Sequence, residues 1–162
     1  MVSARGVVSE VVDPEMPMLT LADLGVVRSV DETGDRVVVT ITPTYSGCPA
    51  VEEMRTDIAA ALTGAGYGPV EVRTVFSPAW STNWISEAGR RKLAEAGVAP
   101  PGPAPVRAAG PIPLTLGPAP AVRCPRCGSP ATDEISRFGP TACTALRRCP
   151  SCREPFEHMK EI

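Results

Sequence analysis

The chain has 162 residues, of which 43% are hydrophobic and 21% charged, and this is ordinary material for one or two folded domains. Its formal charge of −2 argues against a protein that binds nucleic acid or anionic membranes through bulk positive charge. The only histidine is His158, near the end of the sequence. Histidine-based nucleophile triads and histidine-bearing iron sites need more than this residue, so the chain is not expected to be such an enzyme by itself.

The first 17 residues carry four charged side chains and no apolar run long enough for a signal peptide. No segment reaches the roughly 20 apolar residues of a membrane span. We therefore expect a cytoplasmic protein, without a membrane anchor, whose cysteines stay reduced or bind metal.

Hydrophobic periodicity predicts alternating helices and strands in the first part of the chain. The predicted elements, in chain order, are a helix at 4–12, a hairpin of strands 26–30 and 36–42, a helix from Pro49 to 63, a strand at 70–76 and a helix from Ser86 to Gly97. This order indicates an α+β fold, a small α/β sandwich with a three-stranded or larger sheet.

Prolines are concentrated between Ala99 and Pro120, where eight of 22 residues are proline. Such a segment has almost nothing to bury and favours extended backbone, which predicts a linker at 99–121. The chain then divides into a domain at 1–98 and a module at 122–162. The domain has 8 basic and 13 acidic residues and a charge of −5, whereas the module has 7 and 5 and a charge of +2.

Two cysteine pairs in the C-terminal module give the strongest chemical signal. Cys124 and Cys127 are separated by two residues, as are Cys149 and Cys152, and 21 residues lie between the pairs. Two such turns place four thiolates near the corners of a tetrahedron, which is the arrangement of a zinc ribbon. A module of about 40 residues with few large apolar side chains also needs a metal to fold.

Four sulfurs leave no open coordination position, so the predicted role of Zn²⁺ is structural. Rubredoxin-like iron on the same four ligands and reversible disulfides are the alternatives. Cys143, between the pairs, is interpreted as a spare, semi-buried thiol. His158 is expected at the surface and not as a ligand.

Cys48 is the only cysteine of the first domain, and it precedes the helix predicted from Pro49. A thiol at a helix N-terminus meets unpaired N–H groups and the positive end of the helix dipole, which stabilise its thiolate. A thiolate binds soft metals or attacks electrophiles, whereas the alternative is a cysteine that packs as a small hydrophobic residue. Asp13 and Glu15 can bring carboxylates to the same end of the domain, although Asp13 can also simply end a helix.

Several motifs occur in an order that resembles a known family. The segments Asp13–Glu15, Asp23–Gly25 and Thr42–Pro49 resemble the signature of the iron–sulfur cluster assembly family that includes SufT-like and cytosolic cluster-targeting proteins. The segments Pro78–Ile85, Phe138–Gly139, Thr141–Cys143 and Glu154–Phe156 narrow this to the family of D subunits of phenylacetyl-CoA epoxidase. One departure is Asn83, where this family is expected to carry an aspartate.

The resemblance implies a non-catalytic accessory role in aerobic phenylacetate degradation. In that system other subunits hold the di-iron site and the flavin and iron–sulfur reductase, and the D subunit helps to mature or insert a metal centre in such a client. Carried over by position, Cys48 is the thiol that handles iron or a transient iron–sulfur cluster, with Asp13 and Glu15 as acidic neighbours. The resemblance also implies that Cys124, Cys127, Cys149 and Cys152 are the zinc ligands.

One thiolate cannot hold an iron–sulfur cluster, which typically takes four ligands. Cys48 would need the Cys48 of a second copy in a homodimer, a client cysteine or a small thiol to complete the site. An incomplete site suits transfer, because a client with more ligands can take the cluster.

Trp80 and Trp84 are four residues apart in a chain with few aromatic residues. They can fasten their segment onto the sheet or form a docking patch for a partner, since tryptophan is enriched at binding hot spots.

Two other functions remain open at this point. The ribbon can be an adaptor or scaffold that binds protein or nucleic acid without handling iron, although aromatic residues for stacking on bases are scarce. Cys48 can also be an enzyme nucleophile, but no histidine lies near it in the sequence to act as its base.

Overall fold

A computed structural model of the chain describes residues 2–104 and 121–162. These residues form two compact units, which divide between Lys92 and Leu93, and each has its own sheet. The α+β class and the C-terminal ribbon predicted from the sequence are confirmed. No helix among the described residues is long and apolar enough to cross a membrane.

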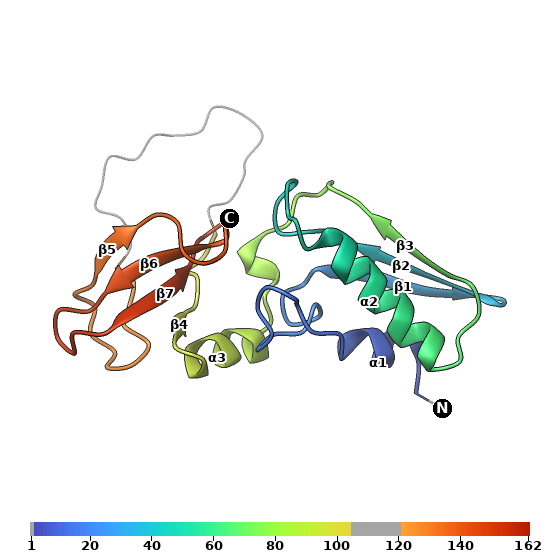
Figure 1. Cartoon of the computed structure of the whole chain (residues 1–162), viewed down its shortest axis with the longest axis horizontal. Coiled ribbons are helices and arrows are strands. Elements are labelled where there is room, and N and C mark those ends of the chain that lie inside the picture. The colour runs from blue at the N-terminus through green and yellow to red at the C-terminus, as the bar shows by residue number, and fades with distance from the viewer. Residues whose placement is uncertain (1, 105–120) are drawn as a thin grey trace. The chain divides into compact units, whose positions relative to one another are not determined.

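Figure 1 shows the helices and strands, which are α1 (Ala4–Ser9), β1 (Val27–Thr33), β2 (Arg36–Ile41), α2 (Val51–Gly64), β3 (Val70–Thr74), the 3₁₀ turn η1 (Thr82–Trp84), α3 (Glu87–Glu95), β4 (Val98–Ala99), β5 (Asp133–Ser136), β6 (Thr144–Arg148) and β7 (Pro155–Met159).

The sheet of the first unit has the strand order β1-β2-β3. β1 and β2 form the predicted antiparallel hairpin, but β1 runs further than expected, to Thr33, and pairs there with Arg36. The connection is therefore only two residues long, and Gly34 in it has φ 63°. A positive φ is what such a tight hairpin turn requires, and glycine adopts it without strain. β3 pairs with β2 in parallel, so α2 forms the crossover between them.

The core of the first unit lies between this sheet and α2, which crosses it in Figure 1. On β2 the buried side chains of Val37, Val39 and Ile41 alternate with more exposed ones, as in a strand with one covered face. On α2, Met54, Ile58 and Leu62 are buried at a spacing of four residues. One face of each element is therefore apolar, which is the pattern from which both are predicted.

The second unit has a four-stranded sheet in the order β4-β7-β6-β5. β5, β6 and β7 pair antiparallel, and β4 joins the edge of β7 in parallel through Val98 and Ala99. The small core combines Ala99 and Phe156 with the buried cysteines Cys124 and Cys149. Residues 98–99, where the sequence predicts the first domain to end and the linker to begin, form β4 of this sheet. Residues 105–120 of the predicted linker lie outside the described residues, and the three-part domain division stays a prediction.

Candidate functional site

The four ribbon cysteines lie together in the second unit. Their sulfurs are all within 4.8 Å of one another, with Sγ–Sγ distances of 3.7 Å for Cys124 and Cys152 and 3.5 Å for Cys127 and Cys149. A tetrahedral zinc site with Zn–S bonds of about 2.3 Å has sulfurs about 3.8 Å apart. The spacing of these sulfurs therefore fits a zinc ion bound by four thiolates.

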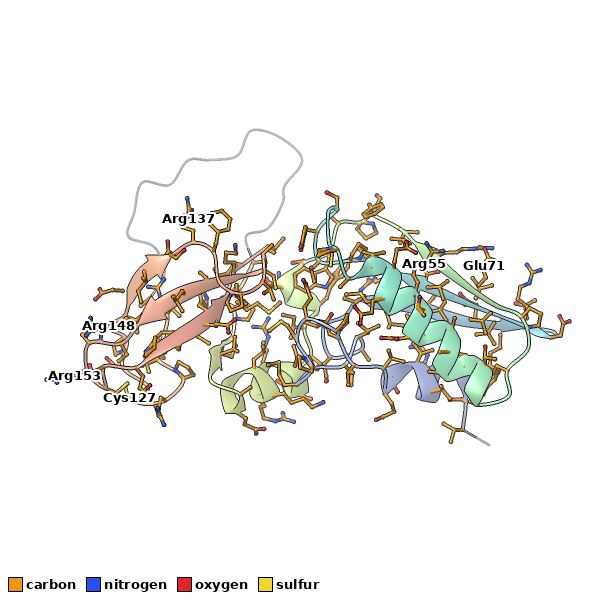
Figure 2. The ribbon with its side chains drawn as sticks, viewed as in Figure 1. Arg55, Glu71, Cys127, Arg137, Arg148 and Arg153 are labelled. Atoms are coloured by element: carbon orange, nitrogen blue, oxygen red, sulfur yellow. The ribbon has the colours of Figure 1, made fainter. Side chains whose placement is uncertain are left out.

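Two similar turns hold these cysteines. In the first turn the N–H of Gly128 donates to the carbonyl of Cys124 at 2.9 Å, and in the second turn the N–H of Arg153 donates to the carbonyl of Cys149 at 2.8 Å. Gly128 has φ 74° and Arg153 has φ 65°, so each turn ends with a left-handed residue directly after its second cysteine. Cys127 and Arg153 lie at the end of the ribbon (Figure 2). Backbone N–H groups are thereby turned toward the sulfurs.

The electrostatics of the cluster also favour a bound cation. The backbone N–H of Cys152 does most to lower the pKa of Cys149, which falls to about 6. The N–H of Ser129 also lowers the pKa of Cys127, but the neighbouring sulfurs and burial outweigh it and raise that pKa to about 12. Packed sulfurs can all be thiolates only when a cation offsets their charges.

Cys48 lies in the turn between β2 and α2, and it is 8% exposed. Its N–H donates to the carbonyl of Tyr45 at 3.2 Å, which closes the turn. The predicted helix start at Pro49 is wrong, because α2 begins at Val51 and Ala50 is its N-cap residue. Cys48 therefore lies just before the helix and not on its first turn.

The acidic residues around this end of α2 act on one another. Burial does most to raise the pKa of Asp13, and the charge of Glu53 in the first turn of α2 raises it further. Burial and the charge of Asp13 raise the pKa of Glu15. Asp13 is 3% exposed, and its Oδ1 accepts the N–H of Glu15 at 2.9 Å and of Met16 at 2.7 Å. These bonds give Asp13 a structural role in its own turn.

The structure does not gather Cys48, Asp13 and Glu15 into one ligand set. Within residues 2–104 and 121–162, the only group of three or more candidate ligand side chains at metal-binding distance is the four ribbon cysteines. The role of Cys48, Asp13 and Glu15 in handling iron stays a prediction, and it requires ligands from elsewhere.

Asp23 has several hydrogen-bond partners in the first unit. Its Oδ2 accepts the N–H of Thr20 at 3.1 Å and the Nζ of Lys92 at 2.6 Å, and its Oδ1 accepts the hydroxyl of Ser86 at 3.2 Å. Its main-chain carbonyl accepts the N–H of Ser86 at 2.9 Å. Asp23 thus ties the Asp23–Gly25 motif to the start of α3, where Ser86 is the predicted cap and its Oγ accepts the N–H of Gly89.

The two tryptophans pack onto the same motif. Trp80 is 3% exposed, and its Nε1 donates to the carbonyl of Leu24 at 2.9 Å, which favours the interpretation that it fastens its segment in place. Trp84 is half-buried, and the guanidinium of Arg28 lies 3.6 Å from its ring centroid. Partner docking by Trp80 and Trp84 stays a prediction, and only Trp84 has an appreciably exposed ring to offer.

Replacement of Asp23 by asparagine is expected to lower the free energy of unfolding of the first unit by about 1–2 kcal/mol at neutral pH. Burial alone would raise the pKa of Asp23, but Lys92 and Thr20 outweigh it and the pKa is lowered. A carboxylate with a lowered pKa stabilises the fold above its unfolded-state pKa, and this contribution is lost as the pH falls through the folded-state pKa. The difference between wild type and Asp23→Asn should therefore shrink below about pH 4. Urea unfolding followed by tryptophan fluorescence measures this, because both tryptophans lie in the first unit.

Asp13→Asn is the control, because its stability relative to wild type should change with pH in the opposite direction. Because the folded-state pKa of Asp13 is raised, its ionisation opposes folding as the pH rises through that pKa, and the asparagine escapes this cost. Asp13→Asn should therefore gain stability relative to wild type between acidic and neutral pH. Equal pH dependence of the two variants would contradict these roles.

Two side chains of the ribbon are more deeply buried than the sequence predicts. The expectation that His158 lies at the surface is wrong, because it is 5% exposed and points inward from β7. The sequence signal for this is available, since His158 follows the buried Phe156 at the two-residue period of a strand. Cys143 is 5% exposed and outside the four-cysteine cluster, with its sulfur 3.1 Å from the hydroxyl of Thr141. It is therefore a buried thiol and not the semi-buried one that the sequence suggests.

Comparison with known proteins agrees with this two-part architecture. Residues 3–74 match the family described as "Iron-sulfur cluster assembly protein", and residues 108–160 match the family described as "PaaD zinc beta ribbon domain". The chain is therefore of the class of proteins in which an iron–sulfur assembly domain is joined to a zinc ribbon.

A relative from Escherichia coli K12 is named as the D subunit of a "Putative 1,2-phenylacetyl-CoA epoxidase". It is 47% identical over 154 residues, which cover 95% of this chain and 88% of the relative. The chain belongs to the family of phenylacetyl-CoA epoxidase D subunits.

Solved structures resemble part of the chain. The crystal structure of a domain of unknown function, DUF59, from Bacillus anthracis has a TM-score of 0.52 and 27% identity, and the match covers 56% of this chain and 87% of that one. A solution structure of Rv1466 from Mycobacterium tuberculosis, titled as a protein associated with [Fe-S] complex assembly and repair, has 30% identity and a TM-score of 0.36 over 57% of this chain and 82% of that one.

Proposed function

We propose that this chain is a non-catalytic accessory subunit of a phenylacetyl-CoA epoxidase system in the cytoplasm, where it assists assembly of iron or iron–sulfur centres in partner subunits. The observation that carries the proposal is the iron–sulfur assembly match over residues 3–74 in a chain of the D-subunit family. Cys48 is the proposed cargo thiol. It lies at the edge of its unit, between the exposed residues Gly47 and Pro49.

Acidic side chains near the start of α2 support a cationic cargo. Burial does most to raise the pKa values of Asp13 and Glu15, and the charge of Glu53 on Asp13 and of Asp13 on Glu15 raises them further, so a positive ion near these carboxylates would relieve their repulsion. A single thiol leaves most of the coordination positions of iron to other donors. These donors would come from a client subunit, from a small thiol or from a second copy of the chain.

We propose Zn²⁺ as the resident metal of the ribbon, with Cys124, Cys127, Cys149 and Cys152 as its ligands. Four thiolates close its coordination sphere, so the metal supplies folding energy to the ribbon and takes no part in cargo chemistry.

Replacement of Cys48 by serine is expected to abolish iron and sulfide binding and to leave zinc unchanged. The experiment compares wild type with Cys48→Ser by elemental analysis and UV–visible spectra after purification without oxygen and reconstitution with iron and sulfide. It then measures cluster content of the iron–sulfur client subunit matured in the presence of each protein. The hydroxyl is a poor ligand for iron, so the serine variant should leave the client unloaded.

Cys143→Ser is the matched control, because Cys143 is also a buried thiol outside the zinc cluster but lies in the second unit. It should behave as wild type in iron uptake and client loading. Zinc alone in every protein, with unchanged client loading by Cys48→Ser, would contradict the cargo role of Cys48 and would favour a scaffold that docks partners without handling iron.

A further inference from the structure

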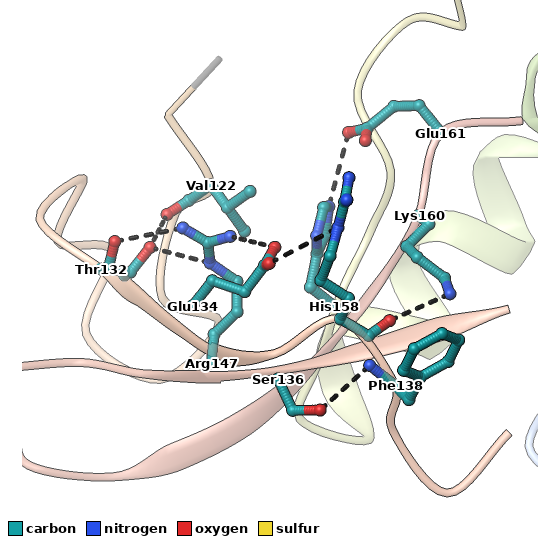
Figure 3. Close-up of polar contacts among 10 residues, drawn as sticks. Val122, Thr132, Glu134, Ser136, Phe138, Arg147, His158, Lys160 and Glu161 are labelled. Atoms are coloured by element: carbon teal, nitrogen blue, oxygen red, sulfur yellow. Dashed lines mark hydrogen bonds and ion pairs between the residues drawn. The ribbon is translucent and has the colours of Figure 1, made fainter. Parts of the chain in front are cut away.

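The ribbon contains a polar hollow that none of the four zinc-site cysteines lines. Its volume is about 250 Å³, and its walls come from β5, β6 and β7 and from the residues that follow β5 and β7. Figure 3 shows how several of its side chains converge. The charged and titratable side chains that line it are Glu134, Arg137, Arg147, His158, Lys160 and Glu161.

The buried imidazole of His158 is the first sign of a missing ligand. Its Nε2 has no hydrogen-bond partner among the described residues. The Oε1 of Glu161 lies 3.4 Å from Nε2 but not in hydrogen-bond geometry, and the same oxygen accepts the N–H of Gly102 at 2.8 Å. A buried polar nitrogen without a partner is unfavourable, so a ligand that accepts a hydrogen bond from its N–H would stabilise this arrangement.

The second sign is positive charge without a close counter-ion. Lys160 has no carboxylate within ion-pair distance in the described part of the chain, and its Nζ donates to the carbonyl of Arg137 at 3.1 Å. The Nε of Arg137 is 4.0 Å from Glu134, at the outer limit of an ion pair, and its side chain is 87% exposed. Two cationic groups that line the hollow thus remain available to a ligand.

The other charges of the hollow are already partnered. Arg147 donates to the carbonyl and hydroxyl of Thr132 at 3.1 and 3.3 Å, and its Nη1 lies 3.6 Å from Glu134. Glu161 accepts a hydrogen bond from the N–H of Gly102, and it faces His158, a contact that Figure 3 shows. With three basic side chains against two carboxylates, before His158 is counted, the hollow favours an anion over a cation.

We propose that this hollow binds a phosphoryl group, with Lys160 and Arg137 neutralising its charge and the Nε2–H of His158 donating to one of its oxygens. A phosphoryl group suits the site better than a carboxylate for two reasons. It carries close to two negative charges at neutral pH, which matches two available cations. It also has several oxygens that point in different directions, as do the donors.

Because His158 is the only histidine, its ring signals in an NMR spectrum need no assignment. The zinc-loaded full chain is titrated with inorganic phosphate at constant pH and ionic strength, with chloride as the replaced anion. A saturable shift of the His158 ring resonances is expected. Lys160→Ala and Arg137→Ala should each weaken binding about tenfold or more, which corresponds to at least about 1.4 kcal/mol.

Arg148→Ala is the matched control. Arg148 is exposed and follows Arg147 on β6, so strand alternation directs it to the opposite face of the sheet. It should leave phosphate binding unchanged. A shift that never saturates, or one that is equally strong in Lys160→Ala, overturns the proposal.

Two further titrations define the ligand. Adenosine monophosphate that binds at least as tightly as inorganic phosphate supports a phosphorylated small molecule as the source of the group. Binding of inorganic phosphate alone supports the free ion. Acetate that binds as tightly as phosphate overturns the assignment to a phosphoryl group.

Discussion

Cys149→Ser is expected to abolish tight zinc binding and to unfold the ribbon, while the first unit stays folded. Structural zinc sites of this kind contribute about 10–16 kcal/mol of apparent binding free energy at neutral pH, and the ribbon has only a small apolar core without it. Cys149 is fully buried in that core. The measurement is zinc content per chain together with an NMR spectrum, in which the resonances of β5, β6 and β7 should collapse and those of β1, β2 and β3 should persist.

The control for this prediction lies in the same module. Cys143→Ser removes a thiol that is also buried but lies outside the sulfur cluster, so one zinc per chain should remain bound. Removal of zinc from wild type with a chelator should reproduce the spectrum of Cys149→Ser. If Cys149→Ser keeps its zinc and its ribbon resonances, the four-thiolate assignment is wrong.

Gly25→Ala is expected to destabilise the first unit by about 3 kcal/mol. Gly25 has φ +70°, where a residue with a Cβ is disfavoured by about 1–2 kcal/mol. The added Cβ would also lie 2.6 Å from the carbonyl oxygen of Trp84 and 2.7 Å from its Cβ, so the backbone must shift at a further cost of about 1–3 kcal/mol. Urea unfolding followed by tryptophan fluorescence gives the free energy.

Gly64→Ala provides the comparison for the same chemical change. Gly64 is the last residue of α2, and a Cβ there would meet no atom within 4 Å. Alanine in a helix is favoured over glycine by about 0.5–1 kcal/mol, so this variant should be slightly more stable than wild type. Equal stability of the two alanine variants would show that the contact between Gly25 and Trp84 is not tight.

Local patterns predict most of the first unit correctly. The alternation in β2 and the four-residue spacing on α2 each follow from burial of one face, which a sequence reports directly. The ribbon can also be predicted from the sequence, because the spacing of the four cysteines by itself defines two turns. The Asp23–Gly25 motif is visible in the sequence as a resemblance, but its physical role as the anchor for Ser86 and Lys92 is not.

The features that the sequence does not reveal depend on contacts distant along the chain. β4 has only two residues, and nothing local indicates that Val98 and Ala99 pair with β7. α2 begins at Val51, after the turn that carries Cys48, and not at Pro49. The sequence does not reveal this, because proline suits both the first position of a helix and a turn. The phosphoryl site proposed around His158 needs side chains from three strands, which no sequence spacing can bring together.

The pairing of β4 with β7 has an evolutionary consequence. β4 and β7 pair in one sheet, although residues 100–154 separate them in the sequence. The entropy lost on closing a flexible loop grows with the logarithm of its length, at about 0.6 kcal/mol for each doubling. A change in the number of residues between β4 and β7 should therefore cost their pairing little in loop-closure entropy. Family members of different length are expected to keep this pairing.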